Sequence, residues 1–406
     1  MHYAALGGKK SSIETLLKRK NPSFKKYDKP WGKVINDKDN DGNTALLLAA
    51  QNNKEACVER LINAKANVRE KNNLNWQLLH FIARSAQKNH WLDFKYCEPY
   101  YSKDIKEADS KGNTPVHHAA YKGNIEFLKK VRKKFEKETK KTFNIANDQN
   151  GKPLHMAIQG DKAYCLQTLI EFTGINKEER SELFLYAAAH GKPECLEKLY
   201  DTGVNIKKDQ RGMTSLHYIV KDDCWINENT PNQERQGYKK CLELLLDFKD
   251  DKEEFININL ANHENKTPFH LAAEAGNIEC LATLLDQQQK GNRVNLDAED
   301  KNSKKPEKLA KGICKKALDE AREILNDENW SNLSLNYFRD KYKEHFKTQV
   351  IQANSQNQHT HNGSETITIP YQEKLFTNDE DVIPIEFKNK YKSIIYHKNK
   401  TIFFKK

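Results

Sequence analysis

Eight cysteines are the residues of this sequence that most invite a chemical role, as metal ligands or as nucleophilic thiols. Five of them occupy one equivalent place, early in a recurring amphipathic segment, where Phe127 stands in another copy: Cys57, Cys165, Cys195, Cys241 and Cys280. No Cys-x-x-Cys pair occurs. We therefore interpret these five as small, reduced core residues, which implies a reducing, cytoplasmic location. Cys97, Cys224 and Cys314 lie off this pattern, without an activating neighbour in sequence.

The histidines offer less chemistry than their number suggests. Six of the fourteen share one place in the same recurring pattern: His2, His80, His117, His155, His217 and His270. His359 and His361 are spaced closely enough to hold a metal ion, but they stand in a polar segment without Cys or carboxylate neighbours. We expect neither a metal site nor a cofactor.

Motifs of the common enzyme classes are missing from the sequence. It contains no GxxxxGK[ST], no GxGxxG after a strand, no HExxH, no GxSxG and no kinase HRD or DFG set. No cysteine follows Cys314, so the C-terminal segment offers no thiol nucleophile. We expect the chain not to be an enzyme; the alternative is a scaffold whose tail belongs to a catalytic domain.

A repeat organises most of the chain and positions these residues. One copy reads Asp109-Ser-Lys-Gly-Asn-Thr-Pro-Val-His-His-Ala-Ala, followed by Gly123, and related copies include Asp39, Asp209 and Asn265. Thr can cap a helix, Pro suits the first helical turn, and paired Ala lets two helices approach closely. A second amphipathic helix follows each Gly. Such helix pairs must bury their faces on their neighbours.

These copies resemble the ankyrin consensus, whose T-P-L-H-x-A signature repeats about every 33 residues. Aligning the second Ala of the signature gives Ala5, Ala50, Ala83, Ala120, Ile158, Ala188, Val220, Ala273 and Lys311. The resemblance implies an all-α ankyrin-repeat solenoid of about nine units over residues 1–326. It also implies that the signature His is structural and links neighbouring loops. The polar last unit suits a capping repeat.

Two places depart from this period. The spacing is 33 residues from Ala50 to Ala83 but 53 from Val220 to Ala273, so we expect about twenty residues to be looped out around an insert at 222–237. Trp225 in this insert either pins the loop to the helices or contacts a partner. The first unit begins in mid-signature and looks incomplete, as if the chain began inside a longer array.

The pattern changes after residue 326. Leu335, Phe338, Tyr342, Phe346 and Val350 form one helical stripe, so residues 327–352 should contain an amphipathic helix that docks on the array. Residues 353–406 combine a polar linker with short β-strands expected at 366–369, 382–387, 392–396 and 401–404. This small β-rich extension either leans on the solenoid or is a truncated domain.

The net charge of +11 and the isoelectric point near 9.0 raise the question of an anionic partner. Only 11 of the 68 basic residues are Arg, whereas bidentate reading of bases or phosphates favours Arg. A solvated Lys-rich surface is the simpler interpretation, and a basic face for nucleic acid or lipid is the alternative. The longest apolar run, Ala45 to Ala50, is too short to span a membrane.

By resemblance, such a solenoid binds a protein partner on its concave face, made by the turns and the exposed side of the first helices. The candidate binding residues are Asn43, Trp76, Asn113, Met213 and Lys266 after the turns; Arg84, Tyr121, Lys122, His190, Lys221 and Glu274 past the paired Ala positions; and Trp225. Exposed Trp, Tyr, Met and Arg side chains are typical of interface hot spots. Trp76 could instead fill a gap in its degenerate unit.

Degenerate units with a Lys, Asn and Ile bias, a long insert and a short unrelated tail resemble the ankyrin-repeat effectors that intracellular bacteria deliver into eukaryotic cells. This resemblance implies delivery into the host cytosol and a eukaryotic host protein as partner. A protist scaffold of the same composition is the alternative.

Overall fold

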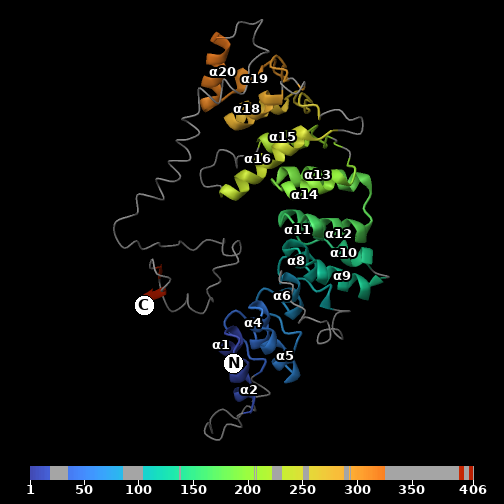
Figure 1. The fold of residues 1–406 in the computed structure, drawn as a ribbon, viewed down its shortest axis with the longest axis vertical. Helices are drawn as coiled ribbons and strands as arrows, with labels where there is room; N and C mark the ends of the chain where they lie inside the picture. Colours follow the sequence, from blue (N-terminus) through green and yellow to red (C-terminus); the bar gives the residue numbers. More distant parts are fainter. Residues whose placement is uncertain are drawn as a thin grey trace.

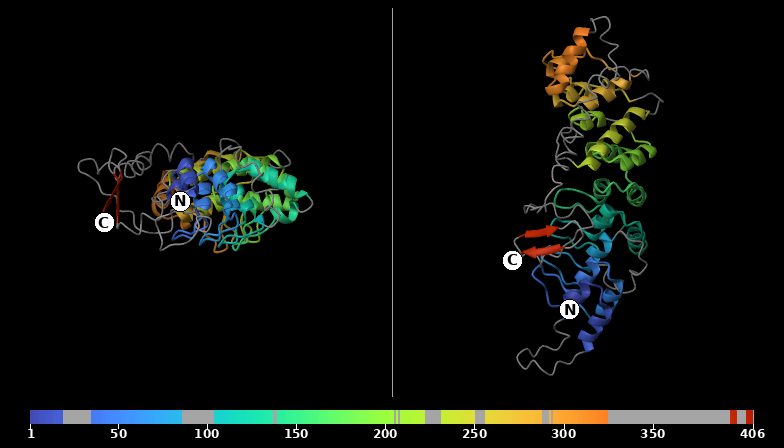
Figure 2. Two further views of the ribbon diagram at one scale, coloured as in Figure 1. Left: turned by 90° about the horizontal axis from the view of Figure 1, so that it is seen from below. Right: turned by 60° about the vertical axis from the view of Figure 1, so that its left-hand side comes forward.

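The computed structural model describes residues 1–18, 35–85, 104–136, 139–221 except 205 and 207, 231–249, 256–287, 292 and 294–324, together with two short strands near the C-terminus. Within these residues the chain forms pairs of helices that stack into one elongated, bowed array (Figure 1). The right-hand view of Figure 2 shows the same array as a long narrow stack. The predicted all-α solenoid is thereby confirmed.

The first helices of the pairs pack on one another and form one layer. They are α1 (His2–Leu6), α4 (Ala45–Gln51), α6 (Leu78–Arg84), α8 (Pro115–Lys122), α11 (Pro153–Gln159), α13 (Lys177–Ala189), α15 (Ser215–Lys221), α17 (Pro268–Ala275) and α19 (Pro306–Leu309). In Figure 1, α4, α6, α8 and α11 line the inner side of the bow.

The second helices form the other layer, and in Figure 1 α9 and α12 lie on the outer side of the bow. They are α2 (Lys10–Lys18), α5 (Glu55–Asn63), α9 (Ile125–Lys134), α12 (Ala163–Thr173), α14 (Pro193–Asp201), α16 (Asn232–Asp247), α18 (Ile278–Asp286) and α20 (Gly312–Ile324). The second helix of the third unit falls outside the described residues. One further short helix, α10 (Thr139–Phe143), packs against α12.

Local sequence explains why the first helices are short. Thr267 caps α17 by accepting a hydrogen bond from the backbone N–H of His270 (3.4 Å), and Pro268 occupies the first helical position. Gly276 ends the same helix at a φ of +77°, a left-handed conformation that favours glycine. The same Thr, Pro and Gly recur around α8.

The aligned small and apolar positions lie in the core between the two layers. From Ala5 to Ala273, the eight aligned residues before the last unit are at most 3% exposed. In the last unit Lys311 is exposed and α19 has only four residues. This polar end is what a terminal unit requires, because nothing packs beyond it within the described array.

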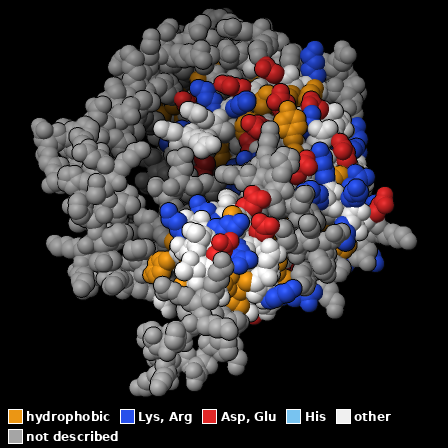
Figure 3. Space-filling model, turned by 60° about the horizontal axis from the view of Figure 1, so that its bottom comes forward, with side chains coloured by type: hydrophobic (Ala, Val, Ile, Leu, Met, Phe, Trp, Pro, Cys, Tyr) orange, Lys and Arg blue, Asp and Glu red, His pale blue; other side chains and the backbone are white. Residues whose placement is uncertain are grey.

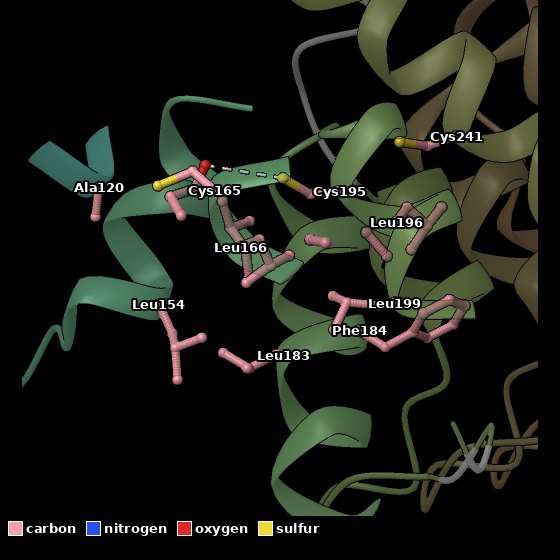
Figure 4. Packing of buried hydrophobic residues seen from close by; sticks show 14 of the residues in the cluster. Ala120, Leu154, Cys165, Leu166, Leu183, Phe184, Cys195, Leu196, Leu199 and Cys241 are labelled. Carbon is pink, nitrogen blue, oxygen red and sulfur yellow. Dashed lines mark hydrogen bonds between the residues drawn. The ribbon is translucent and has the colours of Figure 1, made fainter. Parts of the chain in front are cut away.

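The cysteines of the second helices are buried, as predicted. Figure 4 shows Cys165, Cys195 and Cys241 among leucines of neighbouring units, with the Cys195 thiol directed at the carbonyl oxygen of Ala157 (3.8 Å). The interpretation of Cys314 as off-pattern is wrong: it is the third residue of α20, just as Cys280 is the third residue of α18. Because α19 has only four residues, α20 begins sooner after the signature than the other second helices do, and the repeat alignment did not bring Cys314 into register.

Several of the signature histidines join consecutive units. The Nδ1 atom of His217 accepts the backbone N–H of Thr214 (3.0 Å), so its Nε2 atom carries the proton and donates to the carbonyl oxygen of Lys266 in the next turn (3.0 Å). His117 makes the same bridge to Gly151 (3.0 Å), and His270 makes it to Lys304 (3.2 Å). His2 reaches the carbonyl oxygen of Asn43 in the same way (3.2 Å), so the implied link between loops is confirmed for these four histidines. It does not hold for His80, whose Nε2 has no hydrogen-bond partner among the described residues.

The expected loop at 222–237 is wrong for its second half. Residues 232–237 form the first turns of α16, which has 16 residues. Gly237 makes this possible, because a Cβ atom there would collide with the carbonyl oxygen of Gly191. Beside it, the hydroxyl of Tyr238 donates to the carbonyl oxygen of Ala189 (3.0 Å).

Near the C-terminus, β1 (Ser393–Tyr396) and β2 (Ile402–Lys405) pair antiparallel, with Ser393 opposite Lys405 and Tyr396 opposite Ile402. The helix predicted at 327–352, the polar linker and the strands predicted at 366–369 and 382–387 lie outside the described residues. In the part of the chain that is described, no helix is long and apolar enough to cross a membrane.

We predict that the buried thiols resist labelling in the folded chain. Burial raises the pKa of Cys165 and of Cys314 to about 12, and it raises the pKa of Cys195, Cys241 and Cys280 as well, so both access and thiolate content are low. A chain with Cys97 and Cys224 replaced by Ser should react with a chromogenic disulfide reagent only after unfolding in guanidinium. If the native protein rapidly released one equivalent of the chromophore, one of these thiols would be accessible, and its assignment to the core would be contradicted.

Acid should destabilise the array through its histidines. Burial lowers the pKa of His117 and of His217 to about 4, whereas an unfolded His titrates near 6.5. Between these values the unfolded chain binds more protons, so the free energy of unfolding falls as the pH decreases from about 6.5 to about 4, by up to about 1.4 kcal/mol per pH unit for each imidazole.

Urea unfolding followed by circular dichroism at pH 7.5, 6 and 5 measures this slope. The variant His217→Gln should be less stable at pH 7.5 and should lose less further stability on acidification than the native chain. A urea midpoint that does not move between pH 7 and 5 would rule out neutral, bridging imidazoles.

Candidate functional site

Seven of the turns that precede the first helices share one hydrogen-bond geometry. In each, the Oδ1 atom of a leading Asp or Asn accepts the backbone N–H groups two and four residues later, as Asp109 does from Lys111 and Asn113 (both 2.8 Å). The leading residues are Asp39, Asn72, Asp109, Asn147, Asp209, Asn262 and Asp300. This side chain fixes the path of each turn.

The side chain four residues after this Asp or Asn lies against the next unit. Two of the candidate binding residues, Asn43 and Met213, are therefore buried. Asn43 is only 7% exposed, because its Oδ1 accepts from the amide of Asn72 (2.9 Å). Met213 is 5% exposed, with its sulfur against the amide of Asn262 (3.4 Å). The expected exposure of Met213 is therefore wrong. Asn113 is half-buried and accepts from Asn147 in the same way.

Trp76 occupies this same position in the third unit, but its ring lies across two units. Its ring centroid is 5.0 Å from that of Phe81 in its own unit and 4.3 Å from that of His118 in the next. The guanidinium of Arg84 lies over the ring at 5.4 Å. Both Trp76 and Arg84 are half-buried, so the structure brings these two candidates together in one cluster.

Two further pairs of candidates lie together. The ammonium group of Lys266 is 2.8 Å from a carboxylate oxygen of Glu274, and that of Lys122 lies 5.9 Å from the ring centre of Tyr121. His190 is exposed and its ring lies tilted against that of Tyr186, with ring centroids 4.0 Å apart. Lys221 is exposed at the end of α15, and Trp225 lies outside the described residues.

The structure reveals a row of side chains that the sequence argument did not select. Each residue of this row directly precedes the paired small positions of a first helix: Leu48, Phe81, His118, Met156, Tyr186, Tyr218 and Leu271. We call it the inner-face row. Phe81 and Leu271 are buried, and the other five are half-buried. The signal was available, because each position follows from the repeat alignment alone.

Hydrogen bonds anchor several members of the inner-face row. The hydroxyl of Tyr218 donates to Asp209 of its own turn (2.6 Å), and Nε2 of His118 contacts Asp109 in the equivalent way (2.9 Å). The hydroxyl of Tyr186 accepts from the amide of Gln159 (2.8 Å). These side chains therefore lie between the first helices and the turns, on the surface that both elements share.

The contact of His118 with Asp109 has a clear electrostatic consequence. Burial alone would raise the pKa of Asp109, but the hydrogen bonds from His118 and from the N–H groups of Lys111 and Asn113 outweigh it and lower the pKa to about 2. Asp109 is thus a carboxylate that is fully occupied in holding the turn and the His118 ring. It is 8% exposed, so it offers little to a ligand.

Metal or cofactor chemistry finds little support among these residues. In the ranges that the structure describes, no three His, Cys, Asp or Glu side chains come together as a metal site would require. His359 and His361 lie outside those ranges. What the surface offers is an extended row of aromatic, apolar and amide groups, suited to contact with another macromolecule.

Comparisons with known proteins agree with this architecture. The chain is 26% identical over 189 residues to Transient receptor potential cation channel subfamily A member 1 of Homo sapiens, covering 45% of this chain and 15% of that protein. It is 27% identical over 192 residues to Alpha-latrotoxin-Lg1a of Latrodectus geometricus (46% and 12%), and 23% identical over 189 residues to Inversin of Canis lupus familiaris (45% and 16%). The chain thus matches less than one fifth of each of these relatives.

The family profiles cover more of the chain. The profile described as Ankyrin repeats (3 copies) matches residues 1–92 and 91–181, and the profile described as Ankyrin repeat matches residues 264–301. The second match falls on the unit of α17 and α18, where the Thr, Pro and signature His residues are all present. Helix pairs, turns, imidazole bridges and profiles all agree, and this chain belongs to the ankyrin-repeat family.

Proposed function

We propose that this protein is a binding module that holds a protein partner on the inner face of its ankyrin array. The observation that carries the proposal is the inner-face row, with five half-buried side chains in consecutive or nearly consecutive units. Ankyrin repeats support protein–protein interaction as the general role. The row adds the surface that would perform it.

The row is suited to binding because its side chains are already held in place. Tyr218, Tyr186 and His118 each make a hydrogen bond within the array, so they lose little side-chain entropy when a partner covers them. Their aromatic faces remain partly exposed. Tyrosine and tryptophan at the centre of an interface contribute most to affinity.

The candidates around the row complete the proposed surface. Trp76 and Arg84 lie beside His118, and the exposed ring of His190 extends the surface at Tyr186. Leu74, at the tip of the turn that contains Trp76, is 46% exposed and adds an apolar contact. The predicted delivery into host cells would make the partner a eukaryotic protein.

We predict that Tyr186→Ala and Tyr218→Ala each weaken partner binding by about 1 kcal/mol or more, a loss of roughly fivefold, because each removes a pre-positioned aromatic side chain. A partner is first captured from a eukaryotic lysate on the immobilised native chain and purified. Its affinity for each variant is then measured by calorimetry.

Tyr164→Ala is the matched control, because Tyr164 is 75% exposed on the outer helix α12. It should bind the partner with unchanged affinity, and the melting temperatures of all three variants should show that they are folded. If Tyr164→Ala lowered the affinity as much as the two row variants, or if it alone lowered the affinity, the interface would lie outside the inner-face row.

A further inference from the structure

The outer face carries a concentration of basic side chains that the inner-face proposal does not use. Helix α9 and the short helix α10 contribute Lys129, Lys130, Arg132, Lys133, Lys134, Lys140 and Lys141, which we call the α9–α10 basic patch. All are exposed except Lys130, which is half-buried. Figure 3 shows Lys and Arg along the right-hand edge of the molecule, the side on which Figure 1 places α9 and α10.

Packing fixes this patch on the outside of the array. Helix α9 buries Phe127, Leu128 and Val131 against the core, which leaves its basic residues on the opposite side. Helix α10 buries Phe143, whose ring centroid lies 5.5 Å from that of Phe172. The two helices therefore present their lysines from a rigid base.

Helix α10 is an addition to the repeat. The spacing from Ala120 to Ile158 is 38 residues, compared with 33 between Ala50 and Ala83, and α10 occupies the extra length. The guanidinium of Arg132 lies 4.4 Å from the ring centre of Phe172, which joins the end of α9 to the same site. The inserted residues thus place Lys140 and Lys141 next to an already basic helix end.

A general excess of lysine does not explain the patch. Helix α9 has five basic residues and one acidic residue, whereas α14 has one basic and three acidic residues. Helix α18 has two acidic residues and no basic residue. A compositional bias would act on these outer helices alike, so the charge is concentrated at one place.

Much of this charge is not neutralised within the array. Lys129 pairs with Glu126 at 3.6 Å, but Lys133, Lys140 and Lys141 make no ion pair with any residue that the structure describes. Basic residues in the last turn of α9 do interact favourably with the helix dipole. That effect cannot account for Lys140 and Lys141, which belong to another helix.

We propose that the α9–α10 basic patch docks the protein on a membrane surface rich in anionic phospholipid. Six of its seven cations are lysines, which act as point charges and suit a diffuse negative surface better than bidentate recognition of bases. The patch stands on the outer helices, away from the inner-face row, so a membrane and a protein partner could be bound together. This proposal stands independently of the inner-face function.

Binding to vesicles tests it. The native chain should co-sediment with vesicles of phosphatidylcholine containing about one-third phosphatidylserine, and not with phosphatidylcholine alone. With Lys133, Lys134, Lys140 and Lys141 all changed to Gln, affinity should fall about 600-fold, at about fivefold per lysine. Lys140→Gln with Lys141→Gln alone should lower the affinity about 25-fold. Circular dichroism confirms that both variants are folded.

The matched control removes the same net charge from other exposed lysines of the outer helices, by changing Lys239, Lys240, Lys315 and Lys316 to Gln. It should bind vesicles nearly as well as the native chain. Equal loss in the control would show attraction by net charge only and would overturn the proposal. So would tighter binding of the native chain to duplex DNA than to the anionic vesicles at the same salt concentration, since the patch would then be a nucleic-acid surface.

Discussion

In several units of this array, one imidazole holds a turn to the next turn along the chain. Because Nδ1 of the signature His accepts the N–H of its own Thr, the proton must sit on Nε2, and that proton reaches the carbonyl oxygen of the following turn. The bridge needs the neutral ring, and burial favours the neutral form by lowering the pKa of His117 and His217 to about 4. Tertiary order in the layer of turns thus depends on the protonation state of a few buried side chains.

Much of this fold could be predicted from the sequence, because residues that make contacts within one unit recur at the same place in the other units. The Thr, Pro, His and paired Ala positions mark each first helix, and the recurring Cys marks each second helix. Contacts between units leave a weaker signal. The position after the turn looked exposed in Asn43 and Met213, but the amides of Asn72 and Asn262, about one unit later in the chain, cover them.

The candidate site was harder to predict than the fold for the same reason. The place of Trp76 after its turn makes it a candidate, yet its environment is set by His118 and Arg84, which no local pattern connects to it. Tyr186 and Tyr218 were missed because residues that precede the small pair look like ordinary core positions. The structure shows that both rings are only half-buried and are held by hydrogen bonds to Gln159 and Asp209.

The imidazole bridge also shows where extra residues can be inserted between two units without changing the spacing of the turns. His117 and Gly151 are 34 residues apart in sequence, whereas His217 and Lys266 are 49 apart, yet the hydrogen bond is 3.0 Å in both cases. The added residues enter as α10 in one unit and around the extended α16 in another, so the layer of turns keeps its spacing. Outer-layer additions can therefore bring new surface, such as Lys140 and Lys141, without moving the inner-face row. The proposed protein-binding surface and the proposed membrane-binding patch therefore lie on different helices of the array.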